Sequence, residues 1–183
     1  EIARRRFTVE EYERMGETGI LGPQDRVELI DGEVVQKVTI SPRHAACVTA
    51  LDRVFQFALG DRAVIRVQNP VRLGRHDEPE PDLAVLRPPL VRYRDRHPAP
   101  ADTLLVIEVG DASLTIDRKV KLPRYAHFGI PETWIIDLEA DCIEVCRTPG
   151  LRGYRDVERV ASPRMVSVQA FPDLTLAARD ILG

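Results

Sequence analysis

Two acidic residues, Asp82 and Glu108, interrupt apolar segments of the sequence. Asp82 opens the run DLAVLR directly after Pro81, and Glu108 lies near the end of TLLVIEV (103–109). A charged carboxylate among apolar residues is unfavourable unless a proton or a cation compensates it. If the two runs are neighbouring strands, the side chains converge, and Mg²⁺ accepts oxygen ligands in this arrangement. The pair therefore predicts half of a metal site.

Each acid also has a simpler interpretation. Asp82 alone could cap a turn or lie at an exposed strand end, and Glu108 alone could pair with an arginine, because structural ion pairs are common. The segment DRKVKL (117–122) shifts the balance, since it places lysines soon after Glu108. An ammonium group can orient an attacking water or stabilise charge that grows on a phosphate. Lys119 and Lys121 lie two apart, so at most one of them faces inward on a helix.

An arginine-rich stretch could contact nucleic acid. RPPLVRYRDRHPAPAD (87–102), the longest expected loop, carries Arg87, Arg92 and Arg94 with Tyr93 among them. Clustered arginines with an interleaved aromatic suit a phosphate backbone or stacked bases. Acidic residues and prolines dilute the cluster, so an ordinary solvated loop is the simpler interpretation.

The N-terminal elements that must position these groups have clear local signals. FTVEEYERM carries a capping box, Thr8 with Glu11, and predicts a first helix. RVELIDGEVVQKV contains two strand-like runs joined by Asp31-Gly32, which predicts a β-hairpin. SPRHAACVTALDRVFQFALG begins with Ser41 as a helix N-cap and has apolar residues at helical spacing, which predicts an amphipathic helix on a sheet.

The rest of the chain reads as strands around one more helix. Strand-like runs occur at 63–68, 70–74, 82–87 and 103–109, and then as ETWIIDL, DCIEVCR and GYRDVERVA. TIDRKVKLPRYAHFGI is helical, but Pro123 must kink it or offset its first turn. The tail LTLAARDILG indicates a closing turn or helix. This order predicts a mixed α+β (α/β) fold with one central sheet flanked by helices, and a single domain over 1–183.

Composition adds few constraints on function. The 183 residues are 44% hydrophobic and 30% charged, as in soluble globular proteins. A formal net charge of -3 does not indicate a nucleic-acid binder, so a polyanion would need a local basic patch or metal ions. No apolar run approaches the roughly 20 residues that span a bilayer, and the first residues lack a signal peptide's apolar segment. With an odd number of cysteines, this predicts a cytoplasmic protein without a membrane partner.

Several segments together resemble a known family. RVELIDGEVV, SPRHAACV, EPDLAVL, LLVIEV and DRKVKLPRYAHFGIPETWIIDLE occur in the order and spacing of the Uma-type family. Its members are catalogued as candidate restriction endonucleases, formerly as a domain of unknown function, within the PD-(D/E)xK nuclease superfamily. The similarity extends from about Phe7 to the C-terminus. It implies a restriction-endonuclease-like fold in which an N-terminal helix and β-hairpin precede the mixed central sheet.

The resemblance assigns the three central residues by position. Asp82 falls at the PD element and Glu108 at the D/E element, which implies that both are catalytic and bind the metal. The lysine departs from the superfamily pattern, because Gly110 stands two residues after Glu108. The family pattern places the lysine on the following helix, at Lys121 rather than Lys119.

Two further positions match the family pattern. Glu28 in the hairpin would supply another carboxylate, although an exposed hairpin residue is an equally good interpretation. His44 near the start of the amphipathic helix would act as a ligand or proton carrier, but it could equally be packed or hydrogen-bonded there. Tyr125 and Trp134 are expected in the core, as aromatics at helix and strand positions usually are.

These observations lead to one main functional hypothesis and two alternatives. The resemblance implies a metal-dependent endonuclease that hydrolyses DNA with Mg²⁺ or Mn²⁺, leaves 3′-hydroxyl and 5′-phosphate ends, and acts as a homodimer if it cuts both strands. A catalytically silent nuclease-fold binding or assembly module is the first alternative, supported by a pI of about 5.9 and by Gly110. Hydrolysis of RNA or another phosphoester is the second, because a fold does not fix the substrate.

Overall fold

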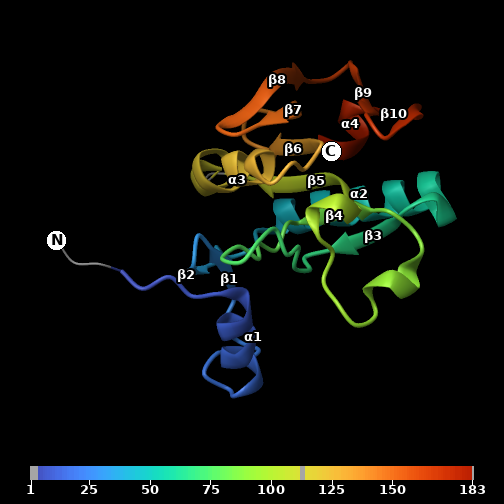
Figure 1. Cartoon of the computed structure of the whole chain (residues 1–183). Coiled ribbons are helices and arrows are strands. Elements are labelled where there is room, and N and C mark those ends of the chain that lie inside the picture. Colours follow the sequence, from blue (N-terminus) through green and yellow to red (C-terminus); the bar gives the residue numbers. More distant parts are fainter. Residues whose placement is uncertain (1–3, 112–113, 183) are drawn as a thin grey trace.

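The centre of the computed structural model, which describes residues 4–111 and 114–182, is a six-stranded sheet (Figure 1). Its strands follow the order β3-β4-β5-β6-β7-β8. Strands β5 and β6 are parallel, and the other neighbours are antiparallel. The bounds are β3 Val64–Val67, β4 Leu83–Leu86, β5 Thr103–Gly110, β6 Glu132–Asp137, β7 Cys142–Gly150 and β8 Gly153–Val160. The predicted mixed central sheet is confirmed.

Helices cover both faces of this sheet. The helices are α1 Val9–Glu17, α2 Pro42–Leu59, α3 Leu122–His127 and α4 Ala178–Leu182. Helices α2 and α4 lie on one face and α3 on the other, whereas α1 lies apart from the sheet (Figure 1). On one face, Phe55 of α2 packs in a cluster with Ile107 of β5 and Trp134 of β6. On the other face, Tyr125 of α3 packs in a second cluster with Val106 of β5. Alternate residues of β5 thus face opposite helices, as the pleat of a strand requires. No helix among the described residues is long and apolar enough to cross a bilayer.

The expected caps and hairpin are present. Thr8 and Glu11 form the capping box of α1, and the Ser41 hydroxyl accepts a hydrogen bond from the backbone N–H of His44. Strands β1 (Val27–Ile30) and β2 (Glu33–Gln36) form the hairpin. Its turn residues Asp31 and Gly32 have φ of 52° and 74°, the left-handed conformation that this dipeptide favours.

Short backbone contacts hold the hairpin to the rest of the molecule. The Gly32 N–H donates to the carbonyl of His76 at 2.7 Å, and the Glu78 N–H donates to the carbonyl of Leu29 at 2.8 Å. The side chain of Arg124 in α3 pairs with Asp77 in the same region. The hairpin is therefore fixed above the side of the sheet that carries α3.

The structure differs from the elements predicted from the sequence in two places. The predicted strand 70–74 is absent from the central sheet and instead bonds locally, with Val71 N–H donating to the carbonyl of Pro79 at 2.9 Å. Prolines at 70, 79 and 81 remove donors that a sheet ladder needs, so this segment cannot extend the sheet. A second hairpin, β9 (Met165–Val168) with β10 (Phe171–Ala177), was not predicted. Its strand β10 includes the first four residues of LTLAARDILG, and only the later part of that segment forms the expected closing helix, α4.

The flaw expected at Pro123 takes the form of an offset first turn. A π-helical turn, η4 (Asp117–Lys121), precedes α3, and Pro123 lies in the first turn of α3. The Leu122 N–H donates to the carbonyl of Asp117, five residues back. Turns of this kind are frequent at functional sites. The single domain expected over 1–183 stays a prediction.

Candidate active site

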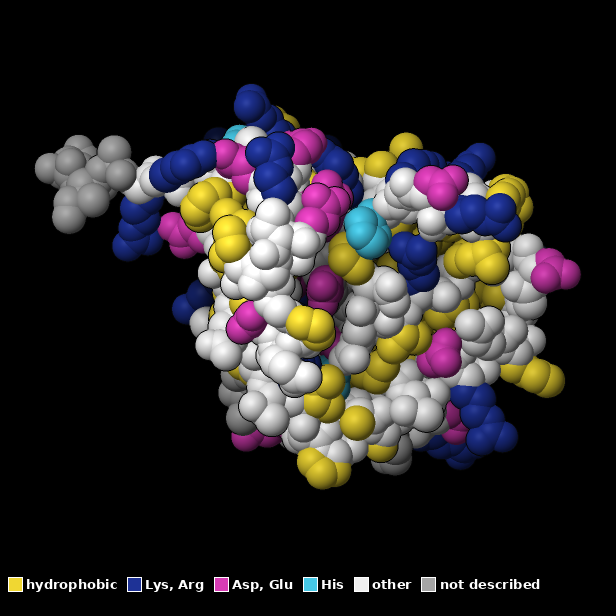
Figure 2. Space-filling model, turned by 90° about the horizontal axis from the view of Figure 1, so that it is seen from below, with side chains coloured by type: hydrophobic (Ala, Val, Ile, Leu, Met, Phe, Trp, Pro, Cys, Tyr) yellow, Lys and Arg dark blue, Asp and Glu magenta, His cyan; other side chains and the backbone are white. Residues whose placement is uncertain are grey.

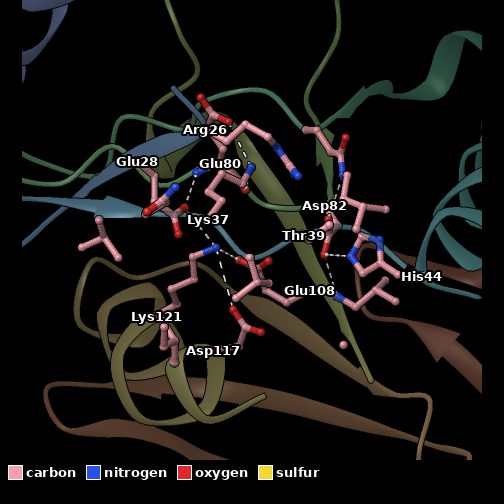
Figure 3. A pocket seen from close by; sticks show the side chains of 18 of the residues that line it. Arg26, Glu28, Lys37, Thr39, His44, Glu80, Asp82, Glu108, Asp117 and Lys121 are labelled. Atoms are coloured by element: carbon pink, nitrogen blue, oxygen red, sulfur yellow. Dashed lines mark hydrogen bonds and ion pairs between the residues drawn. The ribbon is translucent and has the colours of Figure 1, made fainter. Parts of the chain in front are cut away.

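A pocket of about 80 Å³ lies between the hairpin, η4 and the meeting edge of β4 and β5. It collects all five residues that the sequence proposed for the site: Glu28, His44, Asp82, Glu108 and Lys121. Figure 3 shows the ammonium group of Lys121 among carboxylates, and Asp82 facing His44. In Figure 2, acidic side chains lie in a hollow on the lower face of the molecule, with basic side chains near it.

The register of β4 and β5 sets Asp82 across from Glu108. These strands are antiparallel neighbours in which Leu83 lies opposite Ile107, so the next pair toward the pocket is Asp82 with Glu108. Cβ atoms of opposed residues in an antiparallel pair are about 4.5–5.5 Å apart. The two carboxylates are buried, with exposed fractions of 8% and 2%. The two apolar runs therefore form neighbouring strands, which is the condition under which the sequence predicted that Asp82 and Glu108 approach each other.

Three donors hold the Asp82 carboxylate. Oδ2 accepts a hydrogen bond from the backbone N–H of Val109 at 2.8 Å and lies 3.1 Å from His44 Nε2. Oδ1 accepts from the side-chain amide of Gln68 at 3.2 Å. Burial alone would raise the pKa of Asp82, but these hydrogen bonds lower it, and the same contact with Asp82 raises the pKa of His44. Asp82 is therefore ionised at neutral pH.

Lys121 is the centre of the other half of the pocket. Its Nζ lies 3.1 Å from Glu28 Oε2, 3.0 Å from Glu108 Oε1 and 3.8 Å from Asp117 Oδ1. The side chain is buried, whereas that of Lys119 is exposed. Burial alone would lower the pKa of Lys121, but the surrounding carboxylates raise it. The lysine is therefore a fixed positive charge in the pocket.

Glu28 is buried and is not the exposed hairpin residue that one interpretation allowed. Its exposed fraction is 4%, and its Oε2 also accepts the backbone N–H of Glu80 at 3.0 Å. His44 combines both interpretations offered for it, because it is hydrogen-bonded near the start of α2 and also lines the pocket. The catalytic and metal-binding roles of these residues stay predictions.

Two residues that contact this cluster, Asp117 and Tyr125, escaped the sequence analysis as site residues. Asp117 lines the pocket and faces Lys121, and burial raises its pKa. Tyr125 lies in the core as expected, but its hydroxyl donates a 2.6 Å hydrogen bond to Glu108 Oε1. Asp117, Lys121 and Tyr125 are spaced by four residues, which places them on one helical face. That spacing around the candidate lysine was the signal that could have found both.

The electrostatics of the pocket favour a further cation. Glu28, Glu108 and Asp117 surround one ammonium group, so the carboxylates outnumber it. Burial, together with the nearby acids, raises the pKa of Glu108 to about 8, although Lys121 opposes the rise. A buried group with excess negative charge takes up protons or a cation.

The donor chemistry of the pocket fits a hard divalent ion. A carboxylate has about four acceptor positions. Described donors occupy two acceptor positions on Oδ2 of Asp82 and one on its Oδ1. The two described donors that contact Glu108, Lys121 and Tyr125, both bind its Oε1. Oxygen positions therefore remain on both residues. As the described side chains stand, however, no group of three or more His, Cys, Asp or Glu is arranged to hold a metal ion.

The arginines predicted to contact nucleic acid lie elsewhere. Arg87, Arg92 and Arg94 are not among the described residues that line this pocket. Arg87 Nε donates to the carbonyl of Ala101 at 3.1 Å, and Arg92 lies 3.5 Å from Asp102. Their contact with nucleic acid stays a prediction.

Comparison with known proteins places this fold and site in a family. The Uma2 family model, described as "Putative restriction endonuclease", matches residues 9–179. The chain belongs to the Uma2 family. The match confirms the resemblance drawn from the sequence. The matched segment includes every described residue that lines the pocket. No curated protein matches this Uma2 chain.

A solved structure supports the fold of this Uma2 member. A "putative nuclease belonging to DUF820" from Anabaena variabilis ATCC 29413 has a TM-score of 0.76 to it. The alignment covers 96% of this chain and 97% of the other, with 19% sequence identity. At that identity the similarity shows the fold, and the expected nuclease-like α+β architecture of the Uma2 chain is confirmed.

Proposed function

We propose that this chain is a metal-dependent endonuclease that hydrolyses phosphodiester bonds in DNA. The Uma2 family and the structural neighbour from Anabaena variabilis are both described as nucleases. The observation that carries the proposal is the buried ammonium group of Lys121, held by Glu28 and Glu108 in the same pocket as Asp82. A fixed positive charge beside oxygen ligands is the arrangement that phosphoryl transfer requires.

Asp82 and Glu108 would hold the metal, Mg²⁺ or Mn²⁺. Asp82 directly precedes β4, Glu108 lies in the paired strand β5, and both retain acceptor positions after their contacts with described donors are counted. A divalent ion, when bound, neutralises charge that develops on the phosphate and makes water a stronger nucleophile. Carboxylate ligands agree with the preference of these ions for oxygen.

The surrounding side chains position these groups. Lys121 would orient the attacking water and stabilise negative charge on the phosphate oxygens. Tyr125 fixes the orientation of Glu108 through the hydrogen bond to Oε1. His44 keeps Asp82 ionised, and as an imidazolium with a raised pKa it can supply a proton to the departing 3′-oxygen.

A plasmid-nicking assay tests this proposal. Purified protein is incubated with supercoiled plasmid and Mg²⁺ or Mn²⁺, and conversion to nicked and linear forms is followed on gels. The matched variants are Asp82→Asn in the pocket and Asp173→Asn on the surface, where Asp173 pairs with Arg62. We expect activity in the wild type and in Asp173→Asn, and loss in Asp82→Asn. Inactivity of the wild type with either metal, or full activity of Asp82→Asn, would refute the proposal.

One observation favours a second function, a binding or assembly module without turnover. Lys121 already compensates part of the charge on Glu28 and Glu108, and the described side chains do not form a ready metal cluster. Titration with Mn²⁺ separates the two functions, because a ligand that binds the native state raises its thermal stability. A rise in melting temperature that disappears in Asp82→Asn supports the nuclease. No rise at millimolar Mn²⁺ supports the module.

Substrate and assembly follow from the same proposal. Comparing supercoiled DNA with single-stranded RNA of equal nucleotide concentration measures the preference between them, and we expect DNA to be cleaved faster. Cleavage of both strands would require two sites, so we propose a symmetric homodimer. Sedimentation velocity with and without DNA measures this directly, and a monomer in both conditions would rule the dimer out.

A further inference from the structure

A second pocket, rich in basic residues, lies between β3 and the arginine-rich loop. Four arginines and one histidine line it against two acids. It is open and measures about 670 Å³, whereas the candidate active site measures about 80 Å³. Pockets of this larger size accommodate small organic ligands. It therefore has both the volume and the charge to receive a nucleotide phosphate.

Two buried nitrogen atoms in this pocket have no partner among the described residues. Arg66 Nη2 donates to the carbonyl of Tyr93 at 3.2 Å, but Nη1 of the same guanidinium is buried without a hydrogen-bond partner in the described part of the chain. Nδ1 of His97 is in the same situation. An unsatisfied buried polar group is unfavourable, and more so when it is charged. An anion in the pocket would offer the Arg66 guanidinium the acceptor that the described residues do not supply.

The other arginines of the loop are already engaged, apart from Arg94. Arg96 makes two hydrogen bonds to Asp102, at 2.7 and 3.2 Å, and Arg92 lies 3.5 Å from the same carboxylate. The side chain of Arg94 is exposed, lines the pocket and makes no hydrogen bond or ion pair with a described residue. Arg94 is therefore available to a ligand where Arg92 and Arg96 are not.

The sequence offered Tyr93 as a surface on which bases could stack, and the structure does not support that use. The Tyr93 side chain is buried, with an exposed fraction of 3%, and its hydroxyl donates to the carbonyl of Arg87 at 2.6 Å. The guanidinium groups of Arg66 and Arg96 lie 5.7 and 5.6 Å from its ring centre. Tyr93 thus orders the arginines, and its buried ring is not open to a stacking base.

The basic pocket is next to the candidate active site along β3. Arg66 is in β3 and faces the basic pocket, whereas Gln68 directly follows this strand, lines the active site and donates to Asp82. A strand rises about 3.3 Å per residue, so roughly 7 Å separates the two backbone positions. The two pockets are therefore lined by side chains that start two residues apart on one stretch of backbone.

We propose that Arg66, Arg94 and His97 form a phosphate-binding subsite that holds a DNA strand while a nearby phosphodiester lies at Asp82 and Glu108. This inference rests on the proposed nuclease function for its ligand. The contacts are to the backbone and carry no sequence information, so the subsite contributes affinity and register rather than specificity.

Binding of a fluorescently labelled single-stranded DNA oligonucleotide tests the subsite. Affinity is measured by anisotropy in EDTA, so that no cleavage occurs, at several salt concentrations. We expect Arg66→Gln and Arg94→Gln each to weaken binding about tenfold and to reduce the slope of log affinity against log salt by about one. Arg94→Gln changes an exposed side chain, so its effect does not depend on the folding of the variant. Arg53→Gln changes an exposed side chain of α2 that lies outside this pocket and outside the candidate active site, so it should bind like the wild type.

The outcomes separate this inference from the proposed function. Wild-type affinity in both Arg66→Gln and Arg94→Gln, or an equal loss in Arg53→Gln, overturns the subsite even if plasmid is nicked. Selective loss in Arg66→Gln and Arg94→Gln supports the subsite, and it does so even if the wild type nicks no plasmid. In that last case the nuclease proposal fails and a strand-binding pocket stands.

Discussion

Nζ of Lys121 lies 3.0 Å from Oε1 of Glu108, although the superfamily pattern would place the lysine two residues after the acid on the same strand. Gly110 occupies that position, and a Cβ there would collide with the buried side chain of Leu114. The turn η4 instead delivers the ammonium group from the next element. The contact between Lys121 and Glu108 therefore comes from tertiary packing and not from spacing along one strand.

Lys121→Met should destabilise the protein strongly. It removes the charge but keeps a side chain of similar length, which leaves Glu28 and Glu108 buried without their partner. Breaking a buried ion pair costs about 3–5 kcal/mol. Urea denaturation measures the loss, and Lys119→Met, at an exposed position, should change stability by less than about 0.5 kcal/mol. Equal stability of the two variants would contradict the assigned role of Lys121.

Tyr125→Phe should reduce nicking more than it reduces stability. The variant keeps the ring in the core but removes the hydroxyl that donates to Glu108 at 2.6 Å. Loss of a group that orients a ligand typically lowers activity about 10–100-fold. The control is Tyr154→Phe, whose hydroxyl contacts Ile130 and lies outside the pocket. Both should lose roughly 1–2 kcal/mol of stability, and only Tyr125→Phe should lose activity. Full activity of Tyr125→Phe would remove Tyr125 from the site.

The sequence predicted elements whose signals are local. The capping box at Thr8 and the turn at Asp31 are set by a few neighbouring residues, and both are present. The 70–74 segment has strand-like residues, but its backbone N–H groups donate to the carbonyls of Pro79, Pro98 and Asp77 and not to a strand of the central sheet. The β9–β10 hairpin is interrupted by an irregular register after Phe171, which obscures the alternation of its second strand.

The residues of the candidate site likewise fall into those that the sequence could predict and those that only tertiary packing brings together. Convergence of Asp82 and Glu108 could be expected once the strands that carry them were assumed to be neighbours. The pairing of Asp82 with His44 joins residues 38 apart and depends on how α2 packs. Asp117 was not singled out in the sequence, because the pocket that it lines is formed jointly by the hairpin, the β4–β5 edge and η4. Contacts made by tertiary packing leave little trace in one sequence.

Gln68→Gly should separate stability from activity. Gln68 has φ of 50°, a conformation that costs a non-glycine residue on the order of 1 kcal/mol, and it donates to Asp82 Oδ1. The glycine relieves the strain but removes the donor. We expect stability within about 1 kcal/mol of the wild type and nicking about tenfold lower.

The matched control for Gln68→Gly is Thr148→Gly. Thr148 has φ of 58° in β7 and lies outside the candidate active site. Its substitution should change stability by a similar amount and leave nicking unchanged. If Gln68→Gly nicks plasmid at the wild-type rate in the same assay, then Gln68 serves the backbone alone and has no part in positioning Asp82.

Glu78→Gln should alter how stability depends on pH. Glu78 is 3% exposed, and its Oε2 is buried without a partner among the described residues. Burial, and next the charge of Glu13, raises the pKa of Glu78 from 4.5 to about 7. The native state therefore holds this proton more tightly than the unfolded chain. The stability that this provides is complete below pH 4.5 and is lost as the pH rises to about 7.

Urea denaturation at pH 5 and pH 8 measures the effect. One pKa unit corresponds to about 1.4 kcal/mol, so ionisation of Glu78 should cost the wild type up to about 3 kcal/mol between these values. Glutamine mimics the protonated acid, so the variant should keep most of that stability at pH 8. The exposed hairpin variant Glu33→Gln should follow the wild type. If Glu78→Gln and the wild type lose equal stability with rising pH, the carboxyl of Glu78 titrates normally and its burial is compensated by another group.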